Sequence, residues 1–86
     1  FAAIVENRPV VAPQAQTDPA TAEFAADYLV PRGISSMLDV PVWLRGKVVG
    51  VLCHEHVGPA REWTAEDIDF ASSAAMMISL ALEEAR

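Results

Sequence analysis

Two apolar segments with strand-like alternation, 37–44 and 47–56, flank an Arg45-Gly46 step in the middle of the chain. Both segments are rich in β-branched residues, so together they predict an antiparallel hairpin. A third strand is predicted at Val10-Val11-Ala12, a short run of the same kind. The hydrophobic pattern therefore predicts an antiparallel sheet at the centre of the fold.

The clearest helix signal follows the hairpin. Thr64 and Asp67 have the spacing of a capping box, and Trp63 can pack on Ile68 as a hydrophobic staple. The apolar positions that follow form two adjacent stripes, one of Ile68, Ala71, Ala75, Ile78 and Leu82, the other of Phe70, Ala74, Met77 and Ala81. So wide an apolar band can cover a sheet on one side and a second helix on the other.

Two further helices are expected before the hairpin. Residues 1–6 are apolar and Ala-rich and predict the end of a helix, which Pro9 stops. Asp18 precedes Pro19 as an N-cap precedes proline at the first helical position, and this predicts a helix over 20–29 that ends at 30–33.

Length and charge restrict the possible functions. The 86 residues allow one domain, whose small core leaves its stability marginal. Because the chain begins with Phe1 rather than Met, we expect it to be an excerpt of a longer polypeptide. The net charge of −6 and the scattered basic residues argue against nucleic acid as a partner.

The sequence also bears on the compartment. No apolar run approaches the roughly 20 residues that span a bilayer, so this segment is expected to make no membrane contact. Cys53 is the only cysteine and cannot form an internal disulfide, which fits a reducing compartment. We therefore expect a cytoplasmic location.

Three segments together resemble the later half of a GAF domain. They are 35–42 (Ser-Ser-Met-Leu-Asp-Val-Pro-Val), 46–52 (Gly-Lys-Val-Val-Gly-Val-Leu) and 61–67 (Arg-Glu-Trp-Thr-Ala-Glu-Asp). The resemblance implies an α+β, GAF/PAS-like fold: an antiparallel β-sheet with connecting helices over one face, where small ligands bind, and terminal helices behind the other, where protomers pair. Residues 1–86 would then form a partial GAF domain that lacks the family's first helix and first strands.

The resemblance also implies a context in signalling. The segment Cys53-His54-Glu55-His56, followed by Gly58, is similar to GAF domains of bacterial two-component sensors. The implied parent is a sensor histidine kinase, in which this domain acts on an output domain further along the same chain.

The register of the hairpin decides which side chains share a face. A three-residue loop, Leu44 to Gly46, pairs Trp43 with Lys47 and places Met37, Asp39, Val51, Cys53 and Glu55 together; the other face then holds Leu38, Val40, Val42, Leu52 and His54 against the terminal helix. A two-residue Arg45-Gly46 loop groups His54 with Met37 instead. We favour the first arrangement, from turn preferences and from the side on which the family has its pocket.

The favoured face gives the candidate ligand site, which comprises Phe24, Tyr28, Met37, Asp39, Cys53 and Glu55. Its carboxylates can recognise a cationic or hydrogen-bond-donating ligand. The alternative, which the residues alone favour slightly, is that Asp39 and Glu55 lie at a wet sheet end or pair with Arg32 or Arg45. Phe24 and Tyr28 are core residues or pocket wall.

Catalysis and metal binding are not expected. His54 and His56 point the same way on a strand, but two ligands are too few for a structural zinc site, and Cys53 faces away from both. For the same reason Cys53 and His54 cannot share a proton, so we expect no enzyme and a Cys53 that is a buried, apolar residue.

A bound tetrapyrrole is the sharpest cofactor hypothesis, because phytochrome-type GAF domains are similar in their Tyr-Leu and Cys-His segments. This chain departs from them: Ala25 stands where they place a pocket histidine, the region 10–13 replaces their Asp-Ile-Pro segment, and the ligand-side helix has no cysteine. We predict no cofactor and no covalent bilin.

The sequence thus predicts a sensory input domain, in which binding of an unknown small molecule changes the packing of the terminal helix. Two copies are expected to form a homodimer through Phe70, Ala74, Met77 and Ala81. The rival is a ligand-free dimerisation module, whose pocket is filled by Phe24, Tyr28 and Met37. An enzyme of the methionine sulfoxide reductase kind, known among GAF-like folds, needs several reactive cysteines and is the weakest alternative.

Overall fold

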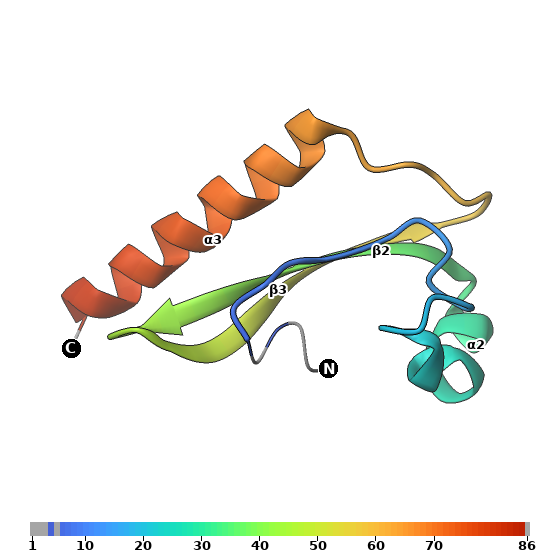
Figure 1. The fold of residues 1–86 in the computed structure, drawn as a ribbon, viewed down its shortest axis with the longest axis horizontal. Helices are drawn as coiled ribbons and strands as arrows, with labels where there is room; N and C mark the ends of the chain where they lie inside the picture. The colour runs from blue at the N-terminus through green and yellow to red at the C-terminus, as the bar shows by residue number, and fades with distance from the viewer. Residues whose placement is uncertain (1–3, 5, 86) are drawn as a thin grey trace.

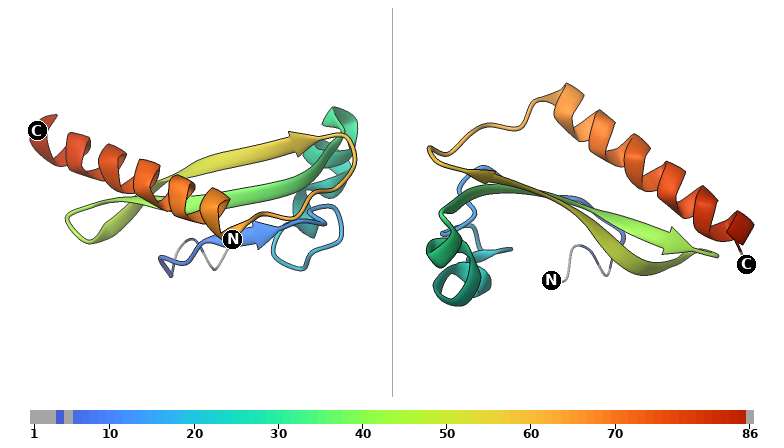
Figure 2. Two further views of the ribbon diagram at one scale, coloured as in Figure 1. Left: turned by 90° about the horizontal axis from the view of Figure 1, so that it is seen from above. Right: turned by 180° about the vertical axis from the view of Figure 1, so that it is seen from behind.

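A three-stranded antiparallel sheet with a long helix on one face forms the body of the molecule (Figure 1). The structure, a computed structural model, describes residues 4 and 6–85. The strands are β1 (Val10–Ala12), β2 (Ile34–Leu44) and β3 (Lys47–Val57), in the order β1-β2-β3. Viewed from above, they lie side by side with β2 in the centre (Figure 2, left). The predicted α+β fold and all three predicted strands are confirmed.

The loop of the β2–β3 hairpin differs from the predicted one, although the side chains fall on the predicted faces. Leu44 pairs with Lys47, so the loop has two residues, and the expected pairing of Trp43 with Lys47 is wrong. Arg45 and Gly46 both have positive φ angles, 53° and 78°, as a type I′ turn requires.

A β-bulge next to the turn shifts the pairing of β2 and β3 by one residue. Trp43 pairs with Val48 and Val42 with Gly50, which leaves Val49 as the extra residue. Beyond the bulge, Asp39 lies opposite Cys53. Because the inserted residue cancels the shift caused by the shorter loop, the expected grouping of side chains on the two faces is confirmed.

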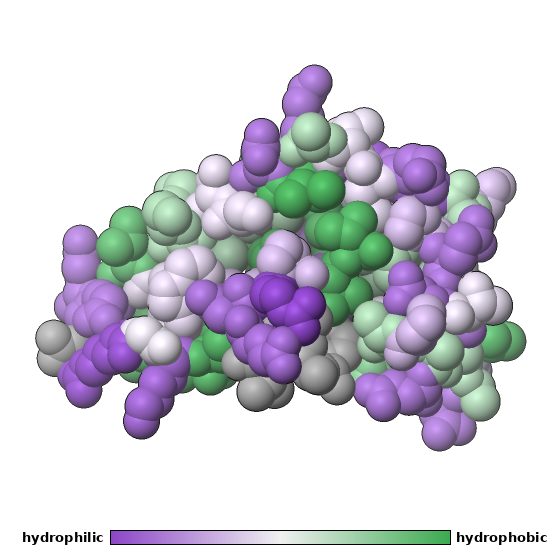
Figure 3. Space-filling model, viewed as in Figure 1, coloured by the Kyte–Doolittle hydropathy of each residue, from purple (hydrophilic) through white to green (hydrophobic). Residues whose placement is uncertain are grey.

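Helix α3 (Ala65–Ala85) covers one face of β2. Its start is as predicted: the Asp67 amide donates to Thr64 Oγ1 at 3.1 Å, and the Thr64 amide donates to Asp67 Oδ2 at 2.9 Å. The residues that bury this face form one cluster, which comprises Leu38, Val40, Val42, Ala71 and Ala75, with Trp43, Leu52, Trp63 and Ile68 packed around it. Figure 3 shows hydrophobic side chains along this junction of helix and sheet.

The buried stripe of α3 differs from the predicted one in its second half. Ala71, Ala75 and Ser79 are buried, whereas Ile78 and Leu82 are each 39% exposed. Ser79 Oγ accepts a 3.1 Å hydrogen bond from the Trp43 amide, and one turn later Glu83 Oε1 accepts one of 3.0 Å from the Arg45 amide. The helix therefore presents small or hydrogen-bonding side chains to the end of the hairpin, and the larger apolar residues lie on its flanks.

The other face of the sheet carries a short helical segment at one end (Figure 1). It comprises a 3₁₀ turn, η1 (Ala22–Phe24), a π-helical turn, η2 (Ala25–Leu29), and α2 (Val30–Arg32). The regular helix expected over 20–29 is wrong in detail. Pro31 has no amide to donate to the carbonyl four residues earlier, so a regular α-helical ladder cannot continue through it.

The helical segment begins later than predicted and ends at a glycine. Asp18 Oδ1 accepts a 2.8 Å hydrogen bond from the Ala20 amide, but the first helical turn begins only at Ala22, after Thr21, so the expected helix start at Pro19 is wrong. Gly33 ends the segment in the left-handed conformation, with a φ of 68°. The helix expected over 1–6 falls mostly outside the described residues.

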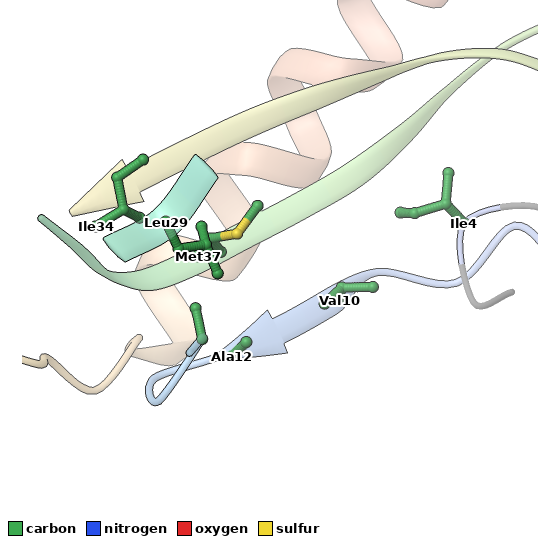
Figure 4. Close-up of a cluster of buried hydrophobic side chains, with 7 residues drawn as sticks. Ile4, Val10, Ala12, Leu29, Ile34 and Met37 are labelled. Atoms are coloured by element: carbon green, nitrogen blue, oxygen red, sulfur yellow. The ribbon is translucent and has the colours of Figure 1, made fainter. Parts of the chain in front are cut away.

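A second apolar cluster fixes this segment to the sheet. It comprises Ile4, Val10, Ala12, Ala15, Leu29, Ile34 and Met37, with Phe24 and Val48 packed against it. Figure 4 shows Leu29 of the helical segment and Met37 of β2 among the side chains of this cluster. Strand β2 is thus buried on both faces by two separate clusters.

Candidate functional site

A hollow of about 310 Å³ lies between the short helical segment and the β2–β3 hairpin, on the face opposite α3. Its lining residues come from η1, η2, β2 and β3, and they are Phe24, Tyr28, Met37, Asp39, Val51, Cys53 and Glu55. All six residues of the predicted ligand site are among them. The structure therefore brings the predicted set together around one space, and ligand binding by that set stays a prediction.

The walls of the hollow are mainly apolar. Met37, on β2, is buried against the helical segment, and Phe24 packs at the edge of the same cluster. Val51, which the predicted ligand set omitted, completes the β3 side. Its position follows from the alternation of β3, because Val51 and Cys53 point to the same side of the sheet. Phe24, Tyr28 and Met37 thus surround the hollow without filling it.

Tyr28 and Glu55 connect the two sides at the rim. Tyr28 donates its hydroxyl hydrogen to Glu55 Oε2 at 2.8 Å. This hydrogen bond raises the pKa of Tyr28 above its usual value of 10.0. The Arg32 guanidinium lies over the Tyr28 ring, 4.3 Å from the ring centroid. The expected alternative, Glu55 paired with Arg32 or Arg45, is replaced by this contact with tyrosine.

Asp39 lies at the floor of the hollow and has no exposed surface. Neither of its carboxyl oxygens has a hydrogen-bond partner among the described residues. Burial is the main reason that the pKa of Asp39 rises from 3.8 to about 6, with Cys53 and His54 lowering it in part and Glu55 raising it. The alternative of a wet sheet end is wrong for this residue.

Cys53 faces Asp39 across the two strands. Its side chain is exposed, which corrects the expectation of a buried cysteine: β3 is the edge strand of the described sheet, and its residues alternate between exposed and half-buried. Partial desolvation of the thiol, with the negative charges of Asp39 and Glu55, raises the pKa of Cys53 to about 11. The thiol is therefore protonated at neutral pH and a poor nucleophile.

The two histidines lie on the face away from the hollow. His54 Nδ1 is 3.1 Å from the Leu38 carbonyl oxygen, and both histidine side chains are half-buried. Among the described residues, no group of three or more His, Cys, Asp or Glu side chains is placed to hold a metal ion. Within the same residues, no helix has the length and apolar character to cross a bilayer.

The predicted dimer stripe lies on the outer side of α3. Phe70 and Met77 are 71% and 70% exposed, Ala81 is exposed and Ala74 is half-buried. Met76 and Leu80 are also more than half exposed. The structure thus leaves an apolar surface on α3 away from the sheet.

Comparison with known proteins places this arrangement in a family. The chain matches the GAF domain over residues 2–82. No curated protein matches it. Among solved structures, the chain is 22% identical to GAF3 from Slr1393 of Synechocystis sp. PCC6803 in its photoproduct state, with a TM-score of 0.84. The match covers 95% of this chain and 51% of that one.

Two further solved structures have the same fold. The GAF domain of the cyanobacteriochrome TePixJ is 25% identical, with a TM-score of 0.81 and coverage of 96% of this chain and 51% of that one. The GAF domain of a two-component sensor histidine kinase from Bacillus halodurans is 20% identical, with a TM-score of 0.74 and coverage of 98% and 55%. The chain thus spans about half the length of the solved structures that it matches.

The buried carboxyl group of Asp39 gives a testable dependence of stability on pH. Because its pKa is higher in the folded chain than in the unfolded chain, the folded state holds the proton more tightly, and stability falls as pH rises from about 4 through about 6. The Asp39→Asn variant has no carboxyl group at this position and therefore lacks this pH-dependent contribution to stability. We expect the free energy of unfolding of the wild type to fall by roughly 2 kcal/mol relative to that variant between pH 4.5 and 7.5, measured by urea denaturation.

The control for this measurement is Asp69→Asn, which removes an exposed carboxylate from α3. The difference between the wild type and this control should stay nearly constant over the same pH range. If the Asp39→Asn curve also runs parallel to the wild type, Asp39 is not a desolvated group.

Proposed function

This chain belongs to the GAF domain family, and on that premise we propose that it is a sensory input domain whose hollow binds a small molecule. The observation that carries the proposal is the position of the hollow on β2. Met37 and Asp39 face the hollow, whereas Leu38 and Val40, which alternate with them, pack on α3. A ligand in the hollow therefore acts on the strand that supports the long helix.

The mechanism is a population shift between two packing arrangements of α3. A ligand can shift such an equilibrium only by the difference between its affinities for the two states. The Asp39 carboxyl group provides such a difference, because it lacks a hydrogen-bond partner among the described residues and a ligand can supply one. The output would be a signalling domain further along the parent chain, on which α3 acts.

A sensor histidine kinase of a bacterial two-component system is the parent that we propose. The support is the resemblance of the 53–58 segment, together with the fold shared with the GAF domain of the Bacillus halodurans sensor histidine kinase. A cytoplasmic location accords with this parent and with the single cysteine.

The domain itself is proposed to be non-enzymatic. Cys53, the only cysteine of the chain, has a raised pKa, and the histidines lie on the opposite face of the sheet. The groups around the hollow thus lack an activated nucleophile with a neighbouring base.

A ligand screen tests the sensory proposal directly. We expect at least one member of a metabolite and nucleotide library to raise the melting temperature of the wild type, because a molecule that binds only the folded state stabilises it. Val51→Trp, which places a large ring in the hollow, should abolish that shift, and Val57→Trp, an exposed site on the same strand, should keep it. A library without any stabilising member would favour the ligand-free dimerisation module.

We propose further that no bilin is covalently attached. The Cys53 thiol is held in its protonated form, and Ala25 stands where phytochrome-type domains place a pocket histidine. After incubation with biliverdin and denaturation in acidic urea, the chain should have no visible absorbance. A band that survives denaturation would reject this proposal.

The partner proposed for the outer side of α3 is a second copy of this chain, in a parallel homodimer through Phe70, Ala74, Met77 and Ala81. Met77→Glu introduces a charge at the centre of the stripe and should give a monomer by light scattering. Met76→Glu is the matched control, since Met76 is exposed about 100° further around the helix and should leave the dimer intact. If Met77→Glu is dimeric, this stripe is not the interface.

A further inference from the structure

We propose that the hollow between the helical segment and the hairpin selects an apolar amine, whose cationic nitrogen is held by the carboxylate of Asp39. The inference rests on the proposed function and names the class of ligand. It depends on three features of the hollow: an unpartnered acid at its floor, apolar walls, and a second acid at its rim.

Asp39, at the floor of the hollow, is the strongest single indication that the ligand carries hydrogen-bond donors. Asp39 is fully buried, and both of its oxygens lack a hydrogen-bond partner among the described residues. Such a group costs free energy unless a donor reaches it, so buried carboxylates are normally paired or hydrogen-bonded. Asp39 lines the hollow, but its two oxygens have no exposed surface, so a ligand with N–H donors supplies the missing partner only if it displaces the neighbouring side chains slightly.

The walls define the rest of the ligand. Met37 and Val51 lie on the strands, and the Phe24 and Tyr28 rings lie on the helical side. A volume of about 310 Å³ is at the lower end of the range for small-molecule sites. It suits one or two rings rather than a nucleotide. Aromatic rings beside a carboxylate also attract a cation through their faces.

The charged residues at the rim favour a ligand of positive charge. Glu55 adds a second carboxylate, while its hydrogen bond with Tyr28 keeps it at the edge of the hollow. Arg32, the nearby cation, stacks on Tyr28, and the two described ion pairs, Arg8–Glu6 and Arg61–Asp67, lie elsewhere. Two acids without a described ion pair repel phosphates and carboxylates and favour a protonated amine.

The same geometry makes binding dependent on pH. Besides burial, three residues shift the pKa of Asp39: Glu55, on its own face, raises it through its negative charge, whereas Cys53, which faces it across the strands, and His54, the next residue of β3, lower it. A cation pairs with the ionised carboxylate, so affinity should rise as pH increases from 5 to 7.5, through the pKa of about 6.

The experiment compares ligands that differ only in charge. Tryptamine and phenethylamine are titrated calorimetrically into the wild type at pH 7.5, beside tryptophol and 2-phenylethanol, which carry a hydroxyl in place of the amine. We expect at least one amine to bind tenfold or more tightly than its alcohol. That amine should bind severalfold more weakly at pH 5.

Variants of the chain then locate the selective group. Asp39→Asn should remove the preference for the amine while the alcohol binds as before, which a merely unfolded variant cannot show. Asp69→Asn, with its exposed site on α3, should bind like the wild type. Glu55→Gln should lower the preference for the amine less than Asp39→Asn does.

Three results would overturn the inference. If the amine and its alcohol bind equally, or if Asp39→Asn retains the preference, the hollow does not select a cation through Asp39, and the sensory role stands unaffected. If neither amine binds, the amine class is wrong. The broad library screen then decides separately whether the hollow binds any ligand.

Discussion

The register of the β2–β3 hairpin is the constraint on which the rest of the structure depends. Side chains alternate along a strand, so a shift of β3 by one residue would turn Cys53 and Glu55 away from Asp39 and bring His54 to the side of the hollow. The two-residue turn at Arg45-Gly46 would produce such a shift by itself, and the bulge at Val49 reverses it. One inserted residue therefore decides that Cys53 and Glu55, and not the two histidines, share the hollow with Asp39.

The same register explains why Asp39 is energetically unusual. Leu and Val side chains surround it on β2 and gain stability from burial, but the carboxyl group loses its water without gaining a partner. A fold selected only for stability would place an apolar residue there. The cost is understandable if occupancy of the hollow supplies a donor, because the ligand then stabilises the state that it binds.

The sequence predicted the features that depend on local chemistry. The capping box at Thr64 and Asp67 and the alternation of the strands specify their own structures. The strand members of the set around the hollow were predicted from that alternation and from the family's pocket side, although through a loop that is wrong. The bulge at Val49 was not predictable, because Val49 has no local feature that distinguishes it from the valines beside it. The exposure of Cys53 depends on what lies beyond β3, and no local pattern contains that information.

Two other features were not predicted from the sequence, the π-helical turn before α2 and the role of Ser79. The helical segment ends at 30–33 as predicted, but the residues before it, Ala25–Leu29, form a π-helical turn that the sequence pattern does not distinguish from a regular helix. Ser79 interrupts the apolar stripe of α3, and its importance appears only when the Trp43 amide is placed beside it.

The hydrogen bond between Ser79 and the Trp43 amide also bears on signalling. The N-terminal half of α3 rests on small alanines, whereas its C-terminal half is held to the hairpin end through Ser79 and Glu83. Under the proposed function, a displacement of β2 at Asp39 must either carry α3 with it through these hydrogen bonds or break them, and two discrete arrangements of the helix follow from that alternative.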